Sequence, residues 1–373
     1  MAEEFTCPNC GASLTLDDPT ATTVRCKFCG TSVVVPESAR RPAPARPLVI
    51  QLRGSGIDPA ILRRVGTVVV ILTVASVLVA GFLGLAGLAL GVFAVAGVPG
   101  DAEPVAGGLG RQISAFGAAG IGAGFFTDAR SLGLDADGRI YIGEYQGGRI
   151  QVFEATGEFV TQWFADREIP LTGMAVRRDG KVYTVQRGQI VLRDGLSGAP
   201  EGTIRYDQGD QFEDVALFPD GGLVTGWYGN RDDIVVFDPG GGWQLTIEEA
   251  VSGQTGDSEL SLRVAANGLG EVLALGEFNS AVFRYDPDGR FVNRFAGEGD
   301  EPGQLRAPMS IVVDGLGRVY VGDIHGVQVF DLEGRFLGSV KTEGVPFGLA
   351  LDSEGDLWVV NGTRVIEYAI AGS

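Results

Sequence analysis

From Gly110 onward the chain repeats itself about every 40 residues, and this repeat constrains the fold more than any other feature. One unit reads LGLDADGRIYIGEYQGGRIQVFEATGEFVTQWF, and another reads IVVDGLGRVYVGDIHGVQVFDLEGRFLGSV. Both alternate apolar and polar residues between turn signals, which is the pattern of half-buried antiparallel strands. A repeat of this length indicates a propeller or a similar array, in which each unit buries its apolar faces against its neighbours.

Turn glycines give the number of units. The first turn glycine recurs at intervals of 42, 41, 49, 47 and 38 residues, at Gly138, Gly180, Gly221, Gly270, Gly317 and Gly355. A third strand follows in each unit, as RIQVF, QIVLR, DIVVF, AVFRY, GVQVF and TRVIEY. We therefore predict six β units.

A fourth strand is present in five units only, as FVTQWF, GTIRY, WQLTI, FVNRF and FLGSV. The sixth unit ends at YAIAGS and has none, but RQISAFG (111–117) resembles RFVNRFAG (290–297). We predict that residues 111–117 complete the sixth unit, because this closes the ring and removes an exposed sheet edge. The predicted fold is mainly β, with a six-bladed β-propeller over residues 111–371.

All four cysteines lie near the N-terminus, in two CxxC pairs separated by 15 residues: Cys7, Cys10, Cys26 and Cys29. This spacing is typical of a zinc site, and four thiolates complete the tetrahedral shell of a structural zinc. We predict a small β zinc ribbon over residues 1–36 that depends on its metal for folding. Disulfides or a thioredoxin-type redox pair are the alternatives. The closed ligand set leaves no position for catalysis at this metal.

An uncharged run extends from Val65 to Gly100. It exceeds the roughly 20 residues that a helix needs to cross a bilayer, and it shows no polar face. We predict a single transmembrane helix over residues 65–98, between a Pro/Arg-rich cytoplasmic linker (37–64) and a second linker (99–110). Its position after the cysteine motif argues against a cleaved signal peptide.

The charges that flank this run predict its orientation. Asp101 and Glu103 follow it, whereas six arginines precede it: Arg40, Arg41, Arg46, Arg53, Arg63 and Arg64. The positive-inside rule then places the N-terminus in the cytoplasm and the propeller outside the cell membrane. Reduced thiolates also belong in the cytosol. Two small-xxx-small pairs in the run, AGFLG and GLALG, would let two helices approach closely, so a homodimer through the transmembrane helix is a further hypothesis.

The net charge of −18 is divided unevenly along the chain. Residues 1–64 contain 8 Lys/Arg and 6 Asp/Glu, which leaves 29 − 8 = 21 Lys/Arg and 47 − 6 = 41 Asp/Glu for the rest. Nucleic-acid binding requires basic patches, so we expect no nucleic-acid partner. The loops expected between blades are acidic, for example DQGDQFED and GEGDEPGQL, which would attract cationic ligands.

A candidate ligand or cation face lies at the ends of the second strands. The aligned positions hold Gln186 and Gly276 together with Glu144, Trp227, Asp323 and Asn361, and Glu277 lies one residue beyond its aligned position. A ring of carboxylates and amides binds Ca²⁺ or another divalent cation through oxygen. The alternative is that each side chain satisfies backbone groups of its own hairpin. The candidate face comprises Glu144, Trp227, Glu277, Asp323 and Asn361.

No catalytic residue or organic-cofactor site emerges from the sequence. His325 is the only histidine, and neither a Ser-His-Asp triad nor a metal site with two imidazoles can be built from one. Its neighbours, VGDIHGVQVF, indicate a turn between two strands.

The repeats resemble NHL repeats, whose units read like GxFxxxFGxxGxxxGQFxxPxGIAVDxxGxVYVxDxxxxRIQVF. The nearest match is GRFVNRFAGEGDEPGQLRAPMSIVVDGLGRVYVGDIHGVQVFD, residues 289–331, whereas MAVRRDGKVYTVQRGQIVLRD lacks the strand-end Asp. The resemblance covers residues 111–370. A membrane span followed by an exported NHL propeller is similar to the sensor half of some bacterial membrane Ser/Thr kinases, although the kinase is absent. In its place stands a module similar to a prokaryotic zinc ribbon.

This resemblance implies a membrane-anchored binding or sensor module rather than an enzyme. Its propeller would recognise a protein or small ligand, and its zinc ribbon would serve for docking. A second hypothesis is a metal-dependent propeller enzyme, because some lactonases and lyases with similar six-bladed folds place a metal in their channel. A third is a cell-envelope scaffold.

The domain division predicts that Cys26→Ser leaves the melting of the propeller unchanged. The substitution opens the zinc shell and unfolds residues 1–36, which the predicted membrane span separates from the propeller. Zinc content should fall from about one ion per chain, while the thermal transition of the β signal in circular dichroism stays in place. A single transition that is shifted in the variant would contradict the division.

Overall fold

The computed structural model describes residues 108–371 and short N-terminal stretches at 5–6, 13–14, 23–25, 27 and 32–34. In these stretches β1 (Phe5–Thr6) pairs with β2 (Ser13–Leu14), and β3 (Thr23–Arg25) pairs with β4 (Ser32–Val34), both antiparallel. Cys7, Cys10, Cys26, Cys29 and residues 65–98 lie outside the described residues, so the zinc ribbon and the transmembrane helix stay predictions. No helix of the described part is long and apolar enough to cross a membrane.

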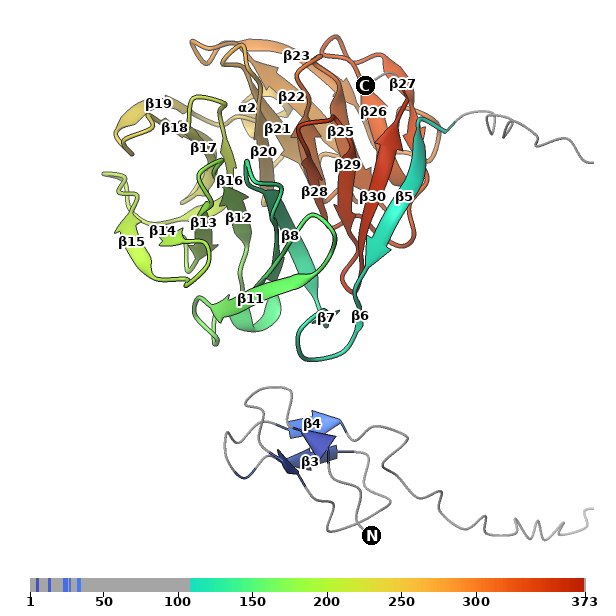
Figure 1. The fold of residues 1–373 in the computed structure, drawn as a ribbon. Coiled ribbons are helices and arrows are strands. Elements are labelled where there is room, and N and C mark those ends of the chain that lie inside the picture. Colours follow the sequence, from blue (N-terminus) through green and yellow to red (C-terminus); the bar gives the residue numbers. More distant parts are fainter. Residues whose placement is uncertain are drawn as a thin grey trace, which may run out of the picture. The chain divides into compact units, whose positions relative to one another are not determined.

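Residues 108–371 form a six-bladed β-propeller, as predicted from the repeats (Figure 1). Each blade is a four-stranded antiparallel sheet. Blades 1 to 3 consist of β8 (Ala129–Leu134), β9 (Ile140–Glu144), β10 (Arg149–Phe153) and β11 (Phe159–Phe164); β12 (Gly173–Val176), β13 (Lys181–Gln186), β14 (Gln189–Asp194) and β15 (Pro200–Thr203); and β16 (Phe212–Leu217), β17 (Leu223–Tyr228), β18 (Asp232–Phe237) and β19 (Trp243–Ile247).

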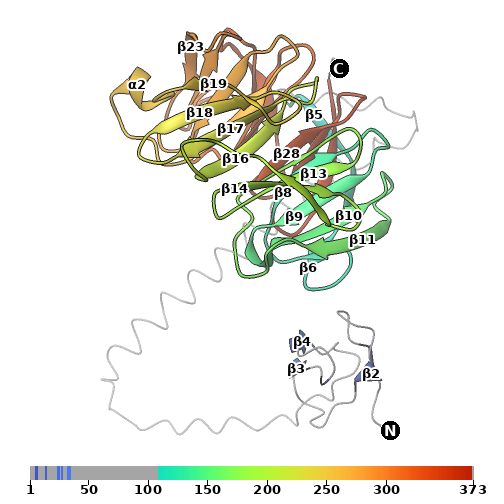
Figure 2. The ribbon, with the colours of Figure 1, turned by 90° about the vertical axis from the view of Figure 1, so that its left-hand side faces the viewer.

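Blades 4 to 6 complete the ring. They consist of β20 (Leu262–Ala266), β21 (Val272–Gly276), β22 (Ala281–Tyr285) and β23 (Phe291–Ala296); β24 (Ser310–Val313), β25 (Val319–Asp323), β26 (Gly326–Phe330) and β27 (Phe336–Val340); and β28 (Gly348–Leu351), β29 (Leu357–Val360), β30 (Val365–Ile370) and β5 (Gly110–Phe116). The minor elements are β6 (Ala118–Ala119), β7 (Phe125–Phe126), a 3₁₀ turn (Gln146–Gly148) and α2 (Ser252–Thr255). Outer strands β11 and β23 lie at opposite sides of the ring (Figure 2).

The turn glycines explain how each blade starts. All six have a positive φ of 80° to 93°, in the left-handed region that only glycine enters without strain: Gly138, Gly180, Gly221, Gly270, Gly317 and Gly355. Each closes the tight turn between the first two strands of its blade. The periodic glycines therefore mark backbone positions, and this is why they located the blades.

Strand β5 closes the ring, as predicted for residues 111–117. It pairs antiparallel with β30, from Val365 opposite Phe116 to Ile370 opposite Gly110. In Figure 1 the teal β5 lies beside the red β30. The first and last strands of the propeller thus share one blade. The pairing leaves β30 no free edge.

The apolar core is divided among the six interfaces between neighbouring blades, each with its own cluster of buried side chains. At the closing interface, Phe153 of blade 1 is 1 % exposed and its ring lies 4.9 Å from that of Phe116 on β5 and 5.9 Å from that of Phe126. Trp358 and Val360 of blade 6 belong to the same cluster. Backbone pairing and aromatic packing therefore close the ring together.

One predicted strand is displaced. GTIRY (202–206) was expected as the outer strand of blade 2, but β15 covers Pro200–Thr203. In the structure Thr203, Gly202 and Pro200 pair with Val191, Leu192 and Arg193 of the neighbouring β14, so the pairing begins before residue 202. The bounds of a strand follow from this backbone pairing, which the alternating side-chain pattern does not report.

The closing interface predicts a large effect of Phe153→Ala. Removal of a fully buried ring that contacts β5 should lower the free energy of unfolding by about 3–5 kcal/mol. Phe278, 65 % exposed, provides the matched control, and Phe278→Ala should change the free energy by less than about 0.5 kcal/mol. Urea unfolding followed by fluorescence measures both. Similar effects of the two substitutions would contradict the assignment of Phe153 to the core.

Candidate functional site

Glu144, at the end of β9, is 2 % exposed and binds an inter-blade loop. Its Oε1 accepts hydrogen bonds from the backbone N–H of Thr127 (2.7 Å) and from the Thr127 hydroxyl (2.8 Å). Its Oε2 accepts one from Arg149 Nε, and the same guanidinium donates through Nη2 to the carbonyl of Phe125 (2.8 Å). The pair thus fastens the segment between β5 and blade 1.

In blades 5 and 6, Asp323 and Asn361 likewise form hydrogen bonds with the main chain of the preceding loop. Asp323 is fully buried; its carboxylate accepts from the backbone N–H of Arg306 (3.1 Å) in the preceding loop and of His325 (2.8 Å) in its own hairpin. The Asn361 amide donates to the carbonyl of Glu343 (2.6 Å). In both residues the side chain is occupied by nearby main chain, in line with the hairpin alternative raised from the sequence.

Gln186 and Trp227 are also engaged close to their own blades. The Gln186 amide bonds both the N–H (2.8 Å) and the carbonyl (2.9 Å) of Asp166. Trp227 is 4 % exposed and donates through Nε1 to the carbonyl of Gly209 (3.0 Å). Of the candidate face, only Glu277 lines the cavity described below.

A cavity of about 530 Å³ occupies the centre of the ring and is lined by the first strand of every blade. The last residue of each of these strands is apolar: Leu134, Val176, Leu217, Ala266, Val313 and Leu351. Charged side chains lie towards the other ends of the strands, at Arg130, Asp214 and Arg263. The channel therefore has an apolar end and a charged mouth.

The charged mouth is built around Arg263 of β20. Its Nε donates to Glu277 Oε1 (2.7 Å), and its Nη1 donates to the carbonyl of Thr172 (2.9 Å) before blade 2 and lies 3.8 Å from Asp214 Oδ1 on blade 3. One side chain thus connects blades 2, 3 and 4. Arg263 also lines the cavity, together with Asp214 and Glu277.

Burial raises the pKa of two carboxyl groups near Arg263, those of Glu213 and Asp214. Burial raises the pKa of Glu213 to about 7, although the N–H of Leu262 and the charge of Arg263 act in the opposite direction. Burial also raises the pKa of Asp214, which accepts from the N–H of Val264 (3.0 Å). Burial lowers the pKa of Arg263, but the charges of Asp214 and Glu277 outweigh it. The cluster therefore combines a fixed cation with a carboxyl that titrates near neutrality.

Arg130 contributes a second guanidinium to the cavity lining. Its Nε and Nη2 bind Asp128 in a forked ion pair (2.7 and 3.2 Å). Its guanidinium carbon lies 4.3 Å from the ring centre of Tyr145 and 5.2 Å from that of Phe347. Two aromatic faces and a carboxylate thus fix Arg130 in one orientation.

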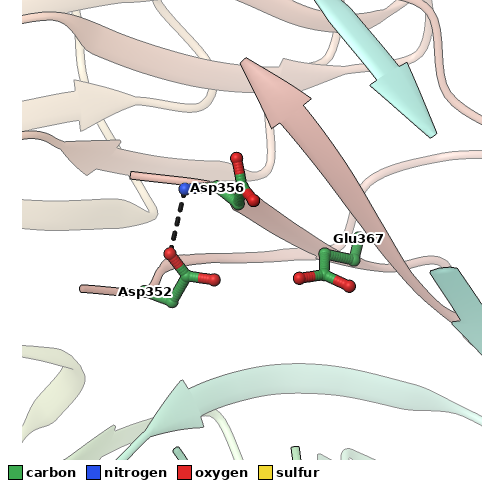
Figure 3. Close-up of side chains that lie close together, drawn as sticks. All are labelled: Asp352, Asp356 and Glu367. Carbon is green, nitrogen blue, oxygen red and sulfur yellow. Dashed lines mark hydrogen bonds between the residues drawn. The ribbon is translucent and has the colours of Figure 1, made fainter. Parts of the chain in front are cut away.

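One acidic group has metal-like spacing. Asp352, Asp356 and Glu367 of blade 6 place one carboxylate oxygen each within 4.8 Å of one another (Figure 3). Asp352 already accepts hydrogen bonds from the Asp356 N–H (3.0 Å) and from Trp358 Nε1 (2.9 Å). No other set of three or more His, Cys, Asp or Glu side chains in the described part of the chain lies so close together. The candidate face and the channel carboxylates therefore do not form such a set.

The sequence analysis missed Arg263, Asp214 and Glu213. A signal was present: the position three residues before the end of each first strand is small in four blades, as Ser131, Gly173, Ser310 and Gly348, and charged in the neighbouring blades 3 and 4. Charged side chains at equivalent positions of adjacent inner strands must meet in the channel. Alignment of the first strands, in place of the second strands, would have found them.

Comparisons with known proteins support the fold. No family model and no curated protein matches the sequence. A gluconolactonase of Xanthomonas campestris has 15 % identity and a TM-score of 0.50, covering 70 % of this chain and 98 % of that one. A luciferin-regenerating enzyme has 14 % identity and a TM-score of 0.52 (69 % and 96 %). A protein assigned as a gluconolactonase has 16 % identity and a TM-score of 0.55 (72 % and 93 %). The chain is similar to these propellers in fold.

The raised pKa of Glu213 predicts that stability decreases as pH rises from about 4.5 to about 7. In this window the unfolded carboxyl ionises while the folded one keeps its proton, so the folded state binds more protons. Glu213→Gln should remove about 1–2 kcal/mol of this decrease, after allowance for partial exposure. Urea unfolding at pH 5 and pH 8 measures it, with exposed Glu158→Gln as control. Equal pH dependence in wild type and Glu213→Gln would refute the assignment.

Proposed function

We propose that the propeller binds a small molecule in its central channel and hydrolyses an ester or lactone bond at the charged mouth. The carrying observation is the arrangement at Arg263, which lines a cavity of about 530 Å³ together with Asp214 and Glu277 and donates a hydrogen bond to Glu277. A cavity of this volume suits a small ligand. The names of two similar propellers, which describe gluconolactonases, support the same reaction class.

The chemistry follows from the two kinds of group. A water oxygen attacks the carbonyl carbon of the substrate, and the guanidinium of Arg263 donates to the carbonyl oxygen as negative charge develops there. A carboxylate of the cluster takes the proton from the water. When the tetrahedral intermediate collapses, the C–O bond to the leaving oxygen breaks, and that oxygen receives the proton. Glu277, which lines the cavity, is placed for both proton transfers.

A divalent cation is not part of this proposal. Ca²⁺ requires six to eight oxygen ligands, whereas the carboxylates of Asp214 and Glu277 lie against the guanidinium of Arg263. Glu144 and Asp323 are already hydrogen-bonded to loops. The residues present do not fit a channel metal, and no step is derived through one.

The N-terminal part adds an anchor to this proposal. We propose that Cys7, Cys10, Cys26 and Cys29 hold a structural zinc, that residues 65–98 cross the cell membrane once, and that the propeller is exported. The cysteine spacing and the flanking arginines support these assignments. The zinc ribbon would dock an unknown partner, and the transmembrane helix would allow a homodimer. The motif at residues 289–331 supports an NHL-type propeller.

Hydrolysis of γ- and δ-lactones and of small esters by the full-length protein tests the proposed reaction. Glu277→Gln should lower kcat/KM by about 10²- to 10⁴-fold. Asp356→Asn changes an acidic group on blade 6 that lies outside the cavity lining, and it should leave turnover unchanged.

Tight binding of a lactone without turnover in the wild type would refute the reaction and favour a sensor module. Equal turnover in the wild type and in Glu277→Gln would refute the site.

A further inference from the structure

The mouth of the channel contains more carboxyl groups than cations on the side of blades 3 and 4. Asp214 and Glu277 both lie against the single guanidinium of Arg263, at 3.8 and 2.7 Å. The Asp214 and Glu277 side chains are 15 % and 22 % exposed, so water screens them only in part. The positive charge of Arg263 offsets the repulsion between these two carboxylates, which is strong in a shielded site.

Arg263 supplies this charge in a fixed position. Its Nε and Nη1 are held by Glu277 and by the carbonyl of Thr172, at 2.7 and 2.9 Å. The side chain is therefore held from two sides of the channel mouth, and it lines the cavity. A guanidinium keeps its charge at every pH at which proteins fold. An oxygen acceptor that enters the cavity meets an oriented cationic donor.

We infer that Arg263 is a built-in cation that takes the place of a divalent metal in this channel, so that ligands are held there through a carbonyl or carboxylate oxygen without a metal ion. A divalent cation at the same place would lie against the guanidinium and compete with it for Asp214 and Glu277. Removal of the guanidinium leaves Asp214 and Glu277 without their cation and converts the mouth into a cation site. The inference rests on the proposed function only for the identity of the ligand.

Thermal unfolding of the full-length protein in detergent, with and without Ca²⁺, tests this inference without any substrate. All variants carry Asp356→Asn, which removes the acidic group on blade 6 as a second cation site. In this background, with Arg263 intact, Ca²⁺ should change the Tm by the same amount whether residue 277 is Glu or is replaced by Glu277→Gln. Adding Arg263→Ala should create a shift of about 5 °C at a hundredfold excess over Kd. Adding Glu277→Gln to Arg263→Ala should abolish the shift.

Arg263→Lys keeps the positive charge, so the Ca²⁺-dependent shift in Tm should not appear in this variant. The comparison with Arg263→Ala separates loss of the charge from loss of the side-chain shape. Should Arg263→Ala fail to fold, Arg263→Gln carries the same expectation. A Ca²⁺-dependent rise in Tm of the protein with Arg263 intact that Glu277→Gln abolishes would overturn the inference, as would equal shifts with and without Arg263. Failure of lactone hydrolysis alone leaves these results unaffected and counts only against the proposed reaction.

Discussion

The pairing of β5 with β30 is the contact on which the rest of the structure depends. It joins Phe116 to Val365 and Gly110 to Ile370 across some 250 residues of chain. Each blade buries its apolar faces only against its two neighbours, so an open ring would leave blades 6 and 1 each with an uncovered face. The central cavity is lined by all six first strands, and its shape therefore requires that the ring be closed.

Buried polar side chains at the strand ends position the channel mouth through their hydrogen bonds to the loops between blades. Gln186 bonds the main chain of the loop before blade 2 at Asp166 and Ile169. The same loop ends at Thr172, whose N–H donates to the carbonyl of Val185 (3.0 Å) and whose own carbonyl accepts from Arg263. The position of the guanidinium thus depends on a glutamine that does not touch the cavity. Such support keeps a charged group in place without further ordering when a ligand binds.

Most of the fold could be predicted from the sequence because its signals are local. Turn glycines such as Gly138 and Gly317 mark positive φ, and alternating apolar residues mark strands such as β10 and β27 at their observed bounds. Closure of the ring was also predictable, since the sixth unit lacked its fourth strand and a matching segment, residues 111–117, preceded the first unit. The interpretation of the strand ends was less secure. The carboxylates of Glu144 and Asp323 suit either a bound cation or the N–H groups of a loop. Only the groups that surround them in the structure distinguish these two roles.

The channel cluster could not be predicted in this way, because Arg263 meets residues 49 and 91 positions away in the sequence, at Asp214 and Thr172. Its presence also needs an explanation other than stability. Buried ion pairs gain little over apolar packing, because desolvation offsets their attraction. Ser131, Gly173, Ser310 and Gly348 show that small residues fill the equivalent positions in four blades. A chain selected for packing alone would also have small residues at these positions of blades 3 and 4. The charged pair at this one sector of the ring is therefore best explained by what enters the channel.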